Sequence, residues 1–233
     1  MRELPRVALY ADLACPYAYI TAYRLRTLRD EYRGRLIIEH KSLALEYVNR
    51  QPTPKQTLDS ECPVLMLAEP ELAWEPWHAL LSEWPVTMWP AFEAVKCAER
   101  QDMTLADDLD WAIRDAFFAG SRCISMRHVL LDLAEHVGLA MDRFTRDFDS
   151  GQAKGQVIEE ARAGWETLKV AGSPTLILPS GRQVSAAAEL GLPEVEVDER
   201  RYGRVTGYQA APCAGADCLA LYRRLLDEAA TAR

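Results

Sequence analysis

The sequence predicts an α/β fold in which a strand–helix–strand half and a strand–strand–helix half are separated by a mainly helical insertion. An apolar run at residues 7–13 passes directly into a helical pattern at residues 16–32. Helical spacing of apolar residues then dominates the middle of the chain. Strand-like runs return only after residue 170, ahead of an amphipathic C-terminal helix. These three observations predict the class.

The composition indicates a folded, water-soluble chain of 233 residues, 49% hydrophobic and 27% charged, with a net charge of −8. The acidic balance argues against nucleic-acid binding, and no apolar run approaches the roughly 18 residues that span a bilayer. Asp12 interrupts the apolar N-terminal run, so a secretion signal is not expected. We therefore expect a cytoplasmic protein with no membrane partner, whose six cysteines are mostly reduced thiols.

The strand–helix–strand half is predicted because the spacing of apolar residues changes from strand-like to helical after residue 13. Pro16 suits the first position of a helix, because its fixed φ is compatible and its missing N–H would lack a partner anyway. Gly34 ends that helix, and the run RLIIEHKSLAL that follows reads as a second strand. Two strands joined by a helix are expected to be parallel, with a right-handed crossover.

The insertion is predicted from helical stripes of apolar residues between residues 109 and 168, whereas residues 50–105 carry a weaker pattern. Four tryptophans lie close together in that weaker part. They are Trp74, Trp77, Trp84 and Trp89. Tryptophan is normally well buried, so we favour core packing over a cleft near Cys15.

The last part of the chain reads as strands and one helix. The run TLIL is a short strand, PSG a turn, and the next strand starts near Gln183. A further hairpin is expected with its turn at residues 200–203, before the amphipathic helix of GADCLALYRRLLDEAA.

Cys15 stands between a strand and a helix that begins with Pro16. The thiolate is the nucleophilic form of cysteine, and a free thiol with a pKa near 8.5 is mostly protonated at neutral pH. A helix N-terminus offers unpaired N–H groups and partial positive charge, which favour an anion. We therefore expect a stabilised Cys15 thiolate, although a buried and inert cysteine would also fit this position.

Three motifs resemble the DsbA-like thioredoxin superfamily, whose relatives include disulfide oxidoreductases, kappa-class glutathione transferases and 2-hydroxychromene-2-carboxylate isomerases. DLACPYAYITAYRL is similar to the active-site turn, FFAGSRCISMRHVLLDLAEHVGL to the inserted helices, and VAGSPTLIL to the cis-proline loop. The resemblance implies a thioredoxin-like domain formed by residues 1–50 and 166–233, with residues 51–165 as the helical insertion.

The resemblance also implies a site. Cys15 would be the catalytic residue, with Pro16, Tyr17 and Ala18 forming the rest of its turn. Pro174 would follow a cis peptide bond, and the backbone of Ser173 would offer N–H and C=O groups to a peptide or a thiol. Sequence alone cannot decide that bond, because only about 5–6% of X–Pro bonds in folded proteins are cis; an ordinary trans proline at a strand start is the alternative.

Ala18 departs from the two-cysteine pattern, in which the second thiol resolves a mixed disulfide. A single cysteine needs an external thiol such as glutathione or mycothiol instead, with no tightly bound cofactor. We therefore favour a thiol–disulfide oxidoreductase acting through Cys15 on a small thiol or a protein disulfide. A glutathione-dependent transferase or isomerase of an aromatic molecule, and a non-catalytic peptide-binding protein, stay open as alternatives.

The remaining cysteines carry weaker signals. Cys213 and Cys218 are expected to be two loop thiols, with a disulfide or a resolving pair as alternatives. They lack the second ligand pair of a zinc site, so no metal is expected. We expect Cys62, Cys97 and Cys123 to pack apolar surface. The sequence leaves a homodimer open.

Overall fold

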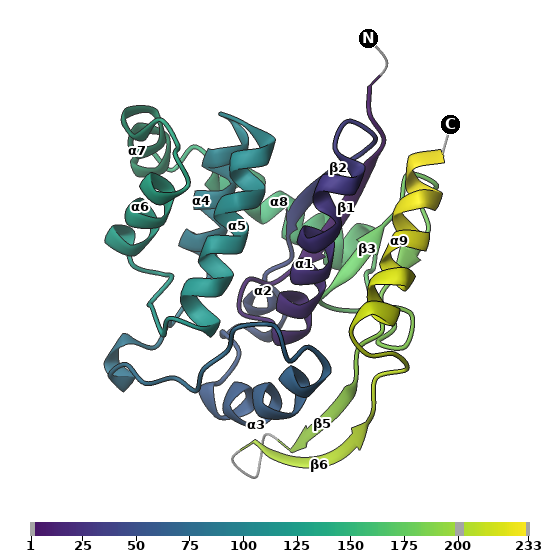
Figure 1. Ribbon diagram of the computed structural model, residues 1–233. Coiled ribbons are helices and arrows are strands. Elements are labelled where there is room, and N and C mark those ends of the chain that lie inside the picture. The colour runs from purple at the N-terminus through teal and green to yellow at the C-terminus, as the bar shows by residue number, and fades with distance from the viewer. Residues whose placement is uncertain (1–2, 199–202, 232–233) are drawn as a thin grey trace.

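The computed structural model describes residues 3–198 and 203–231. Figure 1 shows a mixed sheet on one side and a group of helices on the other, with a separate hairpin at the lower edge. The expected turn at residues 200–203 lies, apart from Gly203, outside the described residues. Within the described ranges, no helix combines the length and the apolar character that crossing a bilayer requires.

The elements occur in the expected order, with a strand–helix–strand half first, the helical insertion next, and the remaining strands and the C-terminal helix last. The strands are β1 (Arg6–Ala11), β2 (Ile37–Ser42), β3 (Thr175–Ile177), β4 (Gln183–Val184), β5 (Glu194–Asp198) and β6 (Arg204–Gln209). The α-helices are α1 (Pro16–Leu28), α2 (Leu45–Asn49), α3 (Lys55–Leu65), α4 (Trp89–Glu99), α5 (Met103–Phe118), α6 (Arg127–His136), α7 (Met141–Asp149), α8 (Lys154–Arg162) and α9 (Ala216–Thr231). A π-helical turn, Ala163–Thr167, continues α8, and 3-10 turns lie at Arg29–Tyr32, Met66–Ala68 and Leu81–Glu83.

The main sheet has the strand order β2-β1-β3-β4. β1 pairs with β2 in parallel, as the strand–helix–strand pattern predicts, and with β3 antiparallel. Tyr10 lies opposite Thr175 in that antiparallel pair, so the same register continued past the strand ends brings Asp12 toward Ser173. The pairing of two distant segments thus positions the candidate site. The α/β class with a helical insertion is confirmed.

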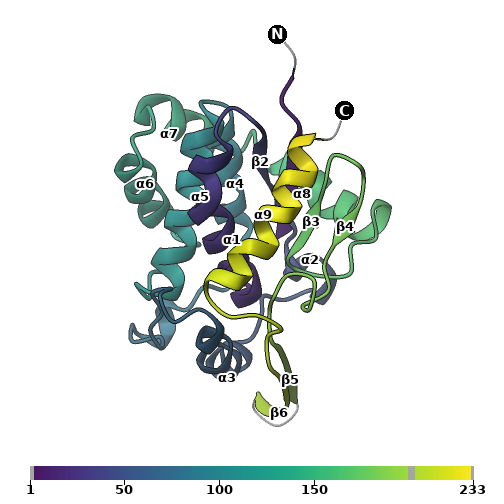
Figure 2. The same ribbon diagram turned by 45° about the vertical axis from the view of Figure 1, so that its right-hand side comes forward.

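Helices cover both faces of the sheet. α1 and α9 lie side by side over one face, as Figure 2 shows, while α8 packs on β2 from the other. α4, α5, α6 and α7 form the helical group at the left of Figure 1. A buried Lys96 joins this group to α8 through an ion pair of 2.9 Å with Glu160, and it also pairs with Glu99 of its own helix at 2.7 Å. Buried charges are tolerated where they are paired in this way.

α3 and the β5–β6 hairpin form the lower end of the molecule in Figure 1. The two strands of the hairpin pair only with each other among the described residues, and both pack against α3. Cys15 lies at the N-terminal end of α1, which points toward this lower end. The candidate site therefore lies between the sheet, α3 and the hairpin.

Candidate active site

Cys15 caps the N-terminus of α1. Its backbone is extended, with φ −84° and ψ 120°, and Pro16 takes the first helical position, as the sequence predicts. The backbone N–H of Tyr19 donates to the Cys15 carbonyl at 3.0 Å and closes the first helical turn. The local sequence therefore places this sulfur where a strand ends and a helix begins.

The loop before β3 supplies the other wall of the site. The Ser173–Pro174 peptide bond is cis. The Cys15 thiol donates to the Ser173 carbonyl oxygen, with 3.3 Å between the sulfur and the oxygen, across 158 residues of sequence. The Ser173 hydroxyl accepts a hydrogen bond of 2.9 Å from the backbone N–H of Asp12. The active-site turn and the proline loop are thus joined directly.

The rest of the turn has two separate tasks. The Tyr17 hydroxyl accepts a hydrogen bond of 3.1 Å from the backbone N–H of Val195, so it ties the turn to β5. Ala18 is fully buried and offers no second sulfur. Tyr17 therefore holds a neighbouring element, while Ala18 only packs.

The expectation of a stabilised Cys15 thiolate is wrong for this conformation. The side chain is 5% exposed, and burial raises the pKa of the thiol to about 11. Hydrogen bonding with Ser173 and with the backbone N–H of Ala18 lowers the pKa of the thiol, whereas the negative charges of Asp12 and Glu61 raise it further. Removing the sulfur from water disfavours its charged form more than the helix end favours it.

Asp12 is a site residue that sequence reasoning missed, since a carboxylate in an apolar run gives no signal of its partners. Its side chain is buried, and its two oxygens accept from the backbone N–H groups of Ala14 and Leu45, each at 2.8 Å. Its carbonyl oxygen accepts from the buried Arg114 at 2.8 Å. Asp12 therefore holds the turn to α2, α5 and the proline loop. Burial raises its pKa to about 6.

Comparison with known proteins decides the family. The family described as DSBA-like thioredoxin domain matches residues 6–192. The chain belongs to that family. No curated protein sequence matches it.

Solved structures share the fold of this DsbA-like chain. The cytosolic disulfide reductase DsbM from Pseudomonas aeruginosa, solved with GSH, has a TM-score of 0.64 at 19% identity, over 95% of this chain and 99% of that one. A protein from Nitrosomonas europaea, provisionally named a protein disulfide isomerase, has 0.64 at 19% identity, over 97% of each chain. A 2-hydroxychromene-2-carboxylate isomerase has 0.57 at 17% identity, over 77% and 87%. At such identities the likeness shows the fold alone.

In this DsbA-like chain, α3 lies close to Cys15. The negative charge of Glu61 raises the pKa of Cys15. The electrostatic interaction with Cys15 likewise raises the pKa of Cys62, whose side chain is 4% exposed. Burial also raises the pKa of Cys62, so both sulfurs are protonated thiols in this conformation. α3 is thus one of the elements that pack around the buried Cys15.

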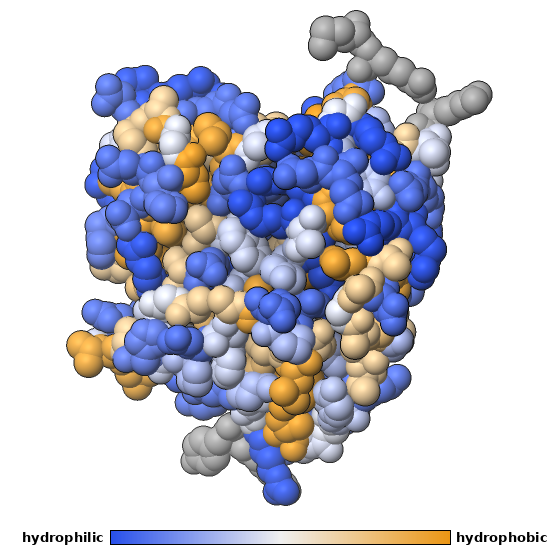
Figure 3. Space-filling view, in the orientation of Figure 1, coloured by the Kyte–Doolittle hydropathy of each residue, from blue (hydrophilic) through white to orange (hydrophobic). Residues whose placement is uncertain are grey.

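Three of the four tryptophans line a pocket of about 270 Å³ beside α3. Its walls include Trp74, Trp77, Trp84, Phe117, Phe118 and Cys62. Trp89 instead begins α4 and packs against Phe92. The loop between α3 and α4 also exposes Leu80, Leu81 and Val86, and apolar surface appears over this loop at the lower left of Figure 3. The expectation that these tryptophans only fill core is therefore too narrow, although the sulfur in this pocket belongs to Cys62 and not to Cys15.

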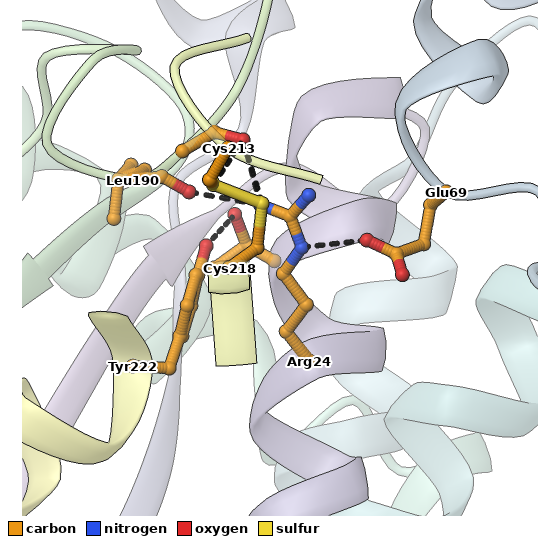
Figure 4. Close-up of a disulfide and its surroundings, with 8 residues drawn as sticks. Arg24, Glu69, Leu190, Cys213, Cys218 and Tyr222 are labelled. Atoms are coloured by element: carbon orange, nitrogen blue, oxygen red, sulfur yellow. Dashed lines mark hydrogen bonds and ion pairs between the residues drawn. A yellow bond between two sulfur atoms is a disulfide. The ribbon is translucent and has the colours of Figure 1, made fainter. Parts of the chain in front are cut away.

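Cys213 and Cys218 correct a second expectation, because they form a disulfide and are not free loop thiols. Figure 4 shows this disulfide beside Arg24 of α1 and Tyr222 of α9. Bonded to each other, neither sulfur is available to resolve a mixed disulfide on Cys15. The free cysteines are Cys15, Cys62, Cys97 and the half-buried Cys123. The described residues contain no group of three or more His, Cys, Asp or Glu side chains that could hold a metal.

Proposed function

We propose that this protein is a thiol–disulfide oxidoreductase in which Cys15 is the nucleophile and an external low-molecular-weight thiol completes each cycle. The observation that carries this proposal is the contact between the Cys15 sulfur and the Ser173 carbonyl beside the cis-proline bond. A substrate disulfide reaching that sulfur would meet the half-buried polar backbone of Ser173 in the same loop. Pro16, Tyr17 and Ala18 would form the opposite wall.

The proposed cycle is balanced by two external thiols. The Cys15 thiolate attacks one sulfur of the substrate disulfide, and the other leaves as a thiolate that takes up a proton. Because position 18 carries no sulfur, an external thiolate must then attack the substrate sulfur that is bound to Cys15. Cys15 leaves as a thiolate, and the product is a mixed disulfide between the substrate half and the external thiol. A second external thiol reduces that product. The net change is one substrate disulfide reduced and one external disulfide formed.

The external thiol we propose is glutathione or mycothiol, used as a co-substrate without a tightly bound cofactor. The Pseudomonas aeruginosa relative, a cytosolic disulfide reductase solved with GSH, supports both this choice and a cytoplasmic location. The net charge of −8 supports small-molecule or protein substrates over nucleic acid.

The test is turnover of a mixed disulfide between glutathione and a short peptide, with reduced glutathione in excess, followed by release of the free peptide thiol. We expect turnover with the natural chain and a fall to the uncatalysed rate with Cys15→Ser. Cys123→Ser is the matched control, because that half-buried free thiol lies elsewhere and its loss should leave turnover unchanged. Equal turnover by Cys15→Ser and the natural chain would refute the proposal.

A second candidate function rests on the aromatic pocket beside α3. A pocket of about 270 Å³ walled by indole and phenyl rings suits a planar aromatic molecule, which a glutathione-dependent transferase or isomerase would use. Titrating a naphthalene carboxylate while following tryptophan fluorescence tests it. Saturable quenching that Trp77→Ala abolishes, together with glutathione-dependent conversion of an aromatic substrate, would favour this candidate over the first.

A further inference from the structure

The Cys213–Cys218 disulfide lies at the base of the β5–β6 hairpin. The chain leaves for the hairpin just after Gly191 and returns from it just before Cys213. The two sulfurs lie 3.7 and 3.8 Å from the Gly191 carbonyl oxygen. Gly191 has φ +63°, and a Cβ atom there would come within 2.5 Å of the Cys213 sulfur. The outgoing and returning segments therefore meet at this disulfide.

Arg24 fixes that meeting point to α1. Its side chain is completely buried, and one guanidinium nitrogen donates to the carbonyl oxygens of Leu190 and Gly191, both at 2.9 Å. Its Nε pairs with Glu69 at 2.7 Å. Figure 4 shows the guanidinium between Glu69 and the two sulfurs. The base of the hairpin is thus anchored to the helix that Cys15 caps.

The body of the hairpin is held at the active site. The backbone N–H of Val195 in β5 donates to the Tyr17 hydroxyl. At the start of β6, Gly203 packs so closely on the carbonyl of Gln56 in α3 that a Cβ atom has no room there. The hairpin therefore packs on α3, and α3 packs on α1 beside the buried Cys15.

We propose that Cys213–Cys218 is a second redox site: its reduction by a small thiol loosens the hairpin and α3 and gives reactants access to Cys15. With the disulfide intact, the hairpin is held at its base, at Tyr17 and at α3, and Cys15 is a buried, protonated thiol. With the disulfide broken, the returning segment loses its cross-link to α9 and is joined to that helix only through the backbone of residues 214 and 215. A reducing thiol pool would then activate the enzyme that uses it.

The chemistry of this reduction balances with two equivalents of a low-molecular-weight thiol. Cys213 is half-buried and Cys218 fully buried, so a thiolate attacks the Cys213 sulfur and the Cys218 sulfur leaves and takes up a proton. A second thiolate attacks the sulfur of the small thiol in this mixed disulfide and releases Cys213. The products are two protein thiols and one small-molecule disulfide, so two electrons pass to the protein.

The test measures access to Cys15 directly. Catalytic activation rests on the proposed function of Cys15, but this readout needs no turnover and can fail or succeed independently. The natural chain is held in buffers of oxidised and reduced glutathione, and iodoacetamide labelling of each cysteine is followed by peptide mass spectrometry. We expect the alkylation rate of Cys15 to rise by about tenfold or more as the Cys213–Cys218 bond is reduced, as local opening of a covering element would give.

Two variants separate loosening of the hairpin from other effects of the reducing buffer. Gly203→Ala should push β6 from α3 and speed alkylation of Cys15 with the disulfide intact. Its matched control is Gly181→Ala, which also has a positive φ, +84° against +73° at Gly203, but has open space around it and should leave that rate unchanged. Cys213→Ser/Cys218→Ser should alkylate at the fast rate in every buffer. Equal rates of Cys15 alkylation in the natural chain with the bond intact and with it reduced would overturn the proposal.

Discussion

The Cys15 sulfur and the Ser173 carbonyl oxygen lie 3.3 Å apart although 158 residues separate them in sequence. Antiparallel pairing of β1 with β3 produces this contact, because Cys15 comes shortly after β1 and Ser173 comes shortly before β3. Burial keeps the thiol in its protonated form until a reactant or a loosened α3 changes its surroundings.

The first prediction concerns the pH dependence of Cys15 alkylation in the protein with its disulfide intact. Burial raises the pKa of this thiol to about 11, so the rate should keep rising with pH through the neutral and mildly alkaline range. Iodoacetamide labelling read out on the Cys15 peptide measures it. A plateau below pH 8 would mean that the thiolate is stabilised in this state, contrary to the burial seen here.

Ala18→Cys should restore a two-cysteine turn. The new thiol would lie one helical turn from Cys15, and we expect an intramolecular disulfide together with dithiol reductase activity that the natural chain lacks. Ala18 is fully buried, so the added atom should also cost about 1–3 kcal/mol of folding free energy.

Reduction of insulin disulfides by a dithiol measures the gain, and Ala18→Ser is the control that adds a similar atom without a thiol. A folded Ala18→Cys protein with no gain would show that the geometry of the turn, and not only the missing sulfur, prevents dithiol chemistry.

Asp12 should make stability depend on pH in the mildly acidic range. Its pKa rises from 3.8 to about 6 on folding, so the folded state binds the proton more tightly. Its contribution to the free energy of unfolding is therefore largest below pH 3.8 and declines as the pH rises to about 6, by about 3 kcal/mol at 1.36 kcal/mol per unit.

Urea unfolding of the natural chain and of Asp12→Asn across this range isolates the contribution, because the amide does not titrate. As the pH rises, the natural chain should lose unfolding free energy relative to Asp12→Asn. A difference that stays constant with pH would contradict the raised pKa.

Loss of the buried Arg24 guanidinium should lower the free energy of unfolding strongly, because several buried groups depend on it. Arg24→Met leaves the Glu69 carboxylate and two carbonyl oxygens without their donor in the interior, which we expect to cost about 3–5 kcal/mol. Chemical unfolding with the disulfide intact measures the loss. Arg33→Met removes a pair with Asp30 in which both side chains are about three-quarters exposed, so its unfolding curve should hardly move; equal losses would contradict the role of burial.

The sequence predicted what depends on local pattern and missed what depends on distant partners. The strand before Cys15 and the helix that begins at Pro16 follow from period and from proline chemistry, and both are confirmed. α3 was not predicted, because Pro52, Pro54 and Pro63 argue against a helix around residues 55–65, and its packing on the hairpin overrides that preference.

The site shows the same division. The proximity of Ser173 to Cys15 was available only through resemblance, and the raised pKa of Cys15 depends on burial by distant segments that no local pattern reports. The partners of Asp12 come from α2, α5 and the proline loop. Cys213 and Cys218 gave no signal for pairing, since their sequence separation of 5 suits loop thiols equally well.

The central claim is that Cys15 forms the mixed disulfide, and mass spectrometry of the intact protein and its peptides after incubation with oxidised glutathione or oxidised mycothiol tests it most directly. The incubation includes enough reduced thiol to open Cys213–Cys218. The account predicts a single thiol adduct on the peptide that contains Cys15, absent in Cys15→Ser. An unmodified Cys15 in the folded protein, with the Cys213–Cys218 bond reduced, would contradict it.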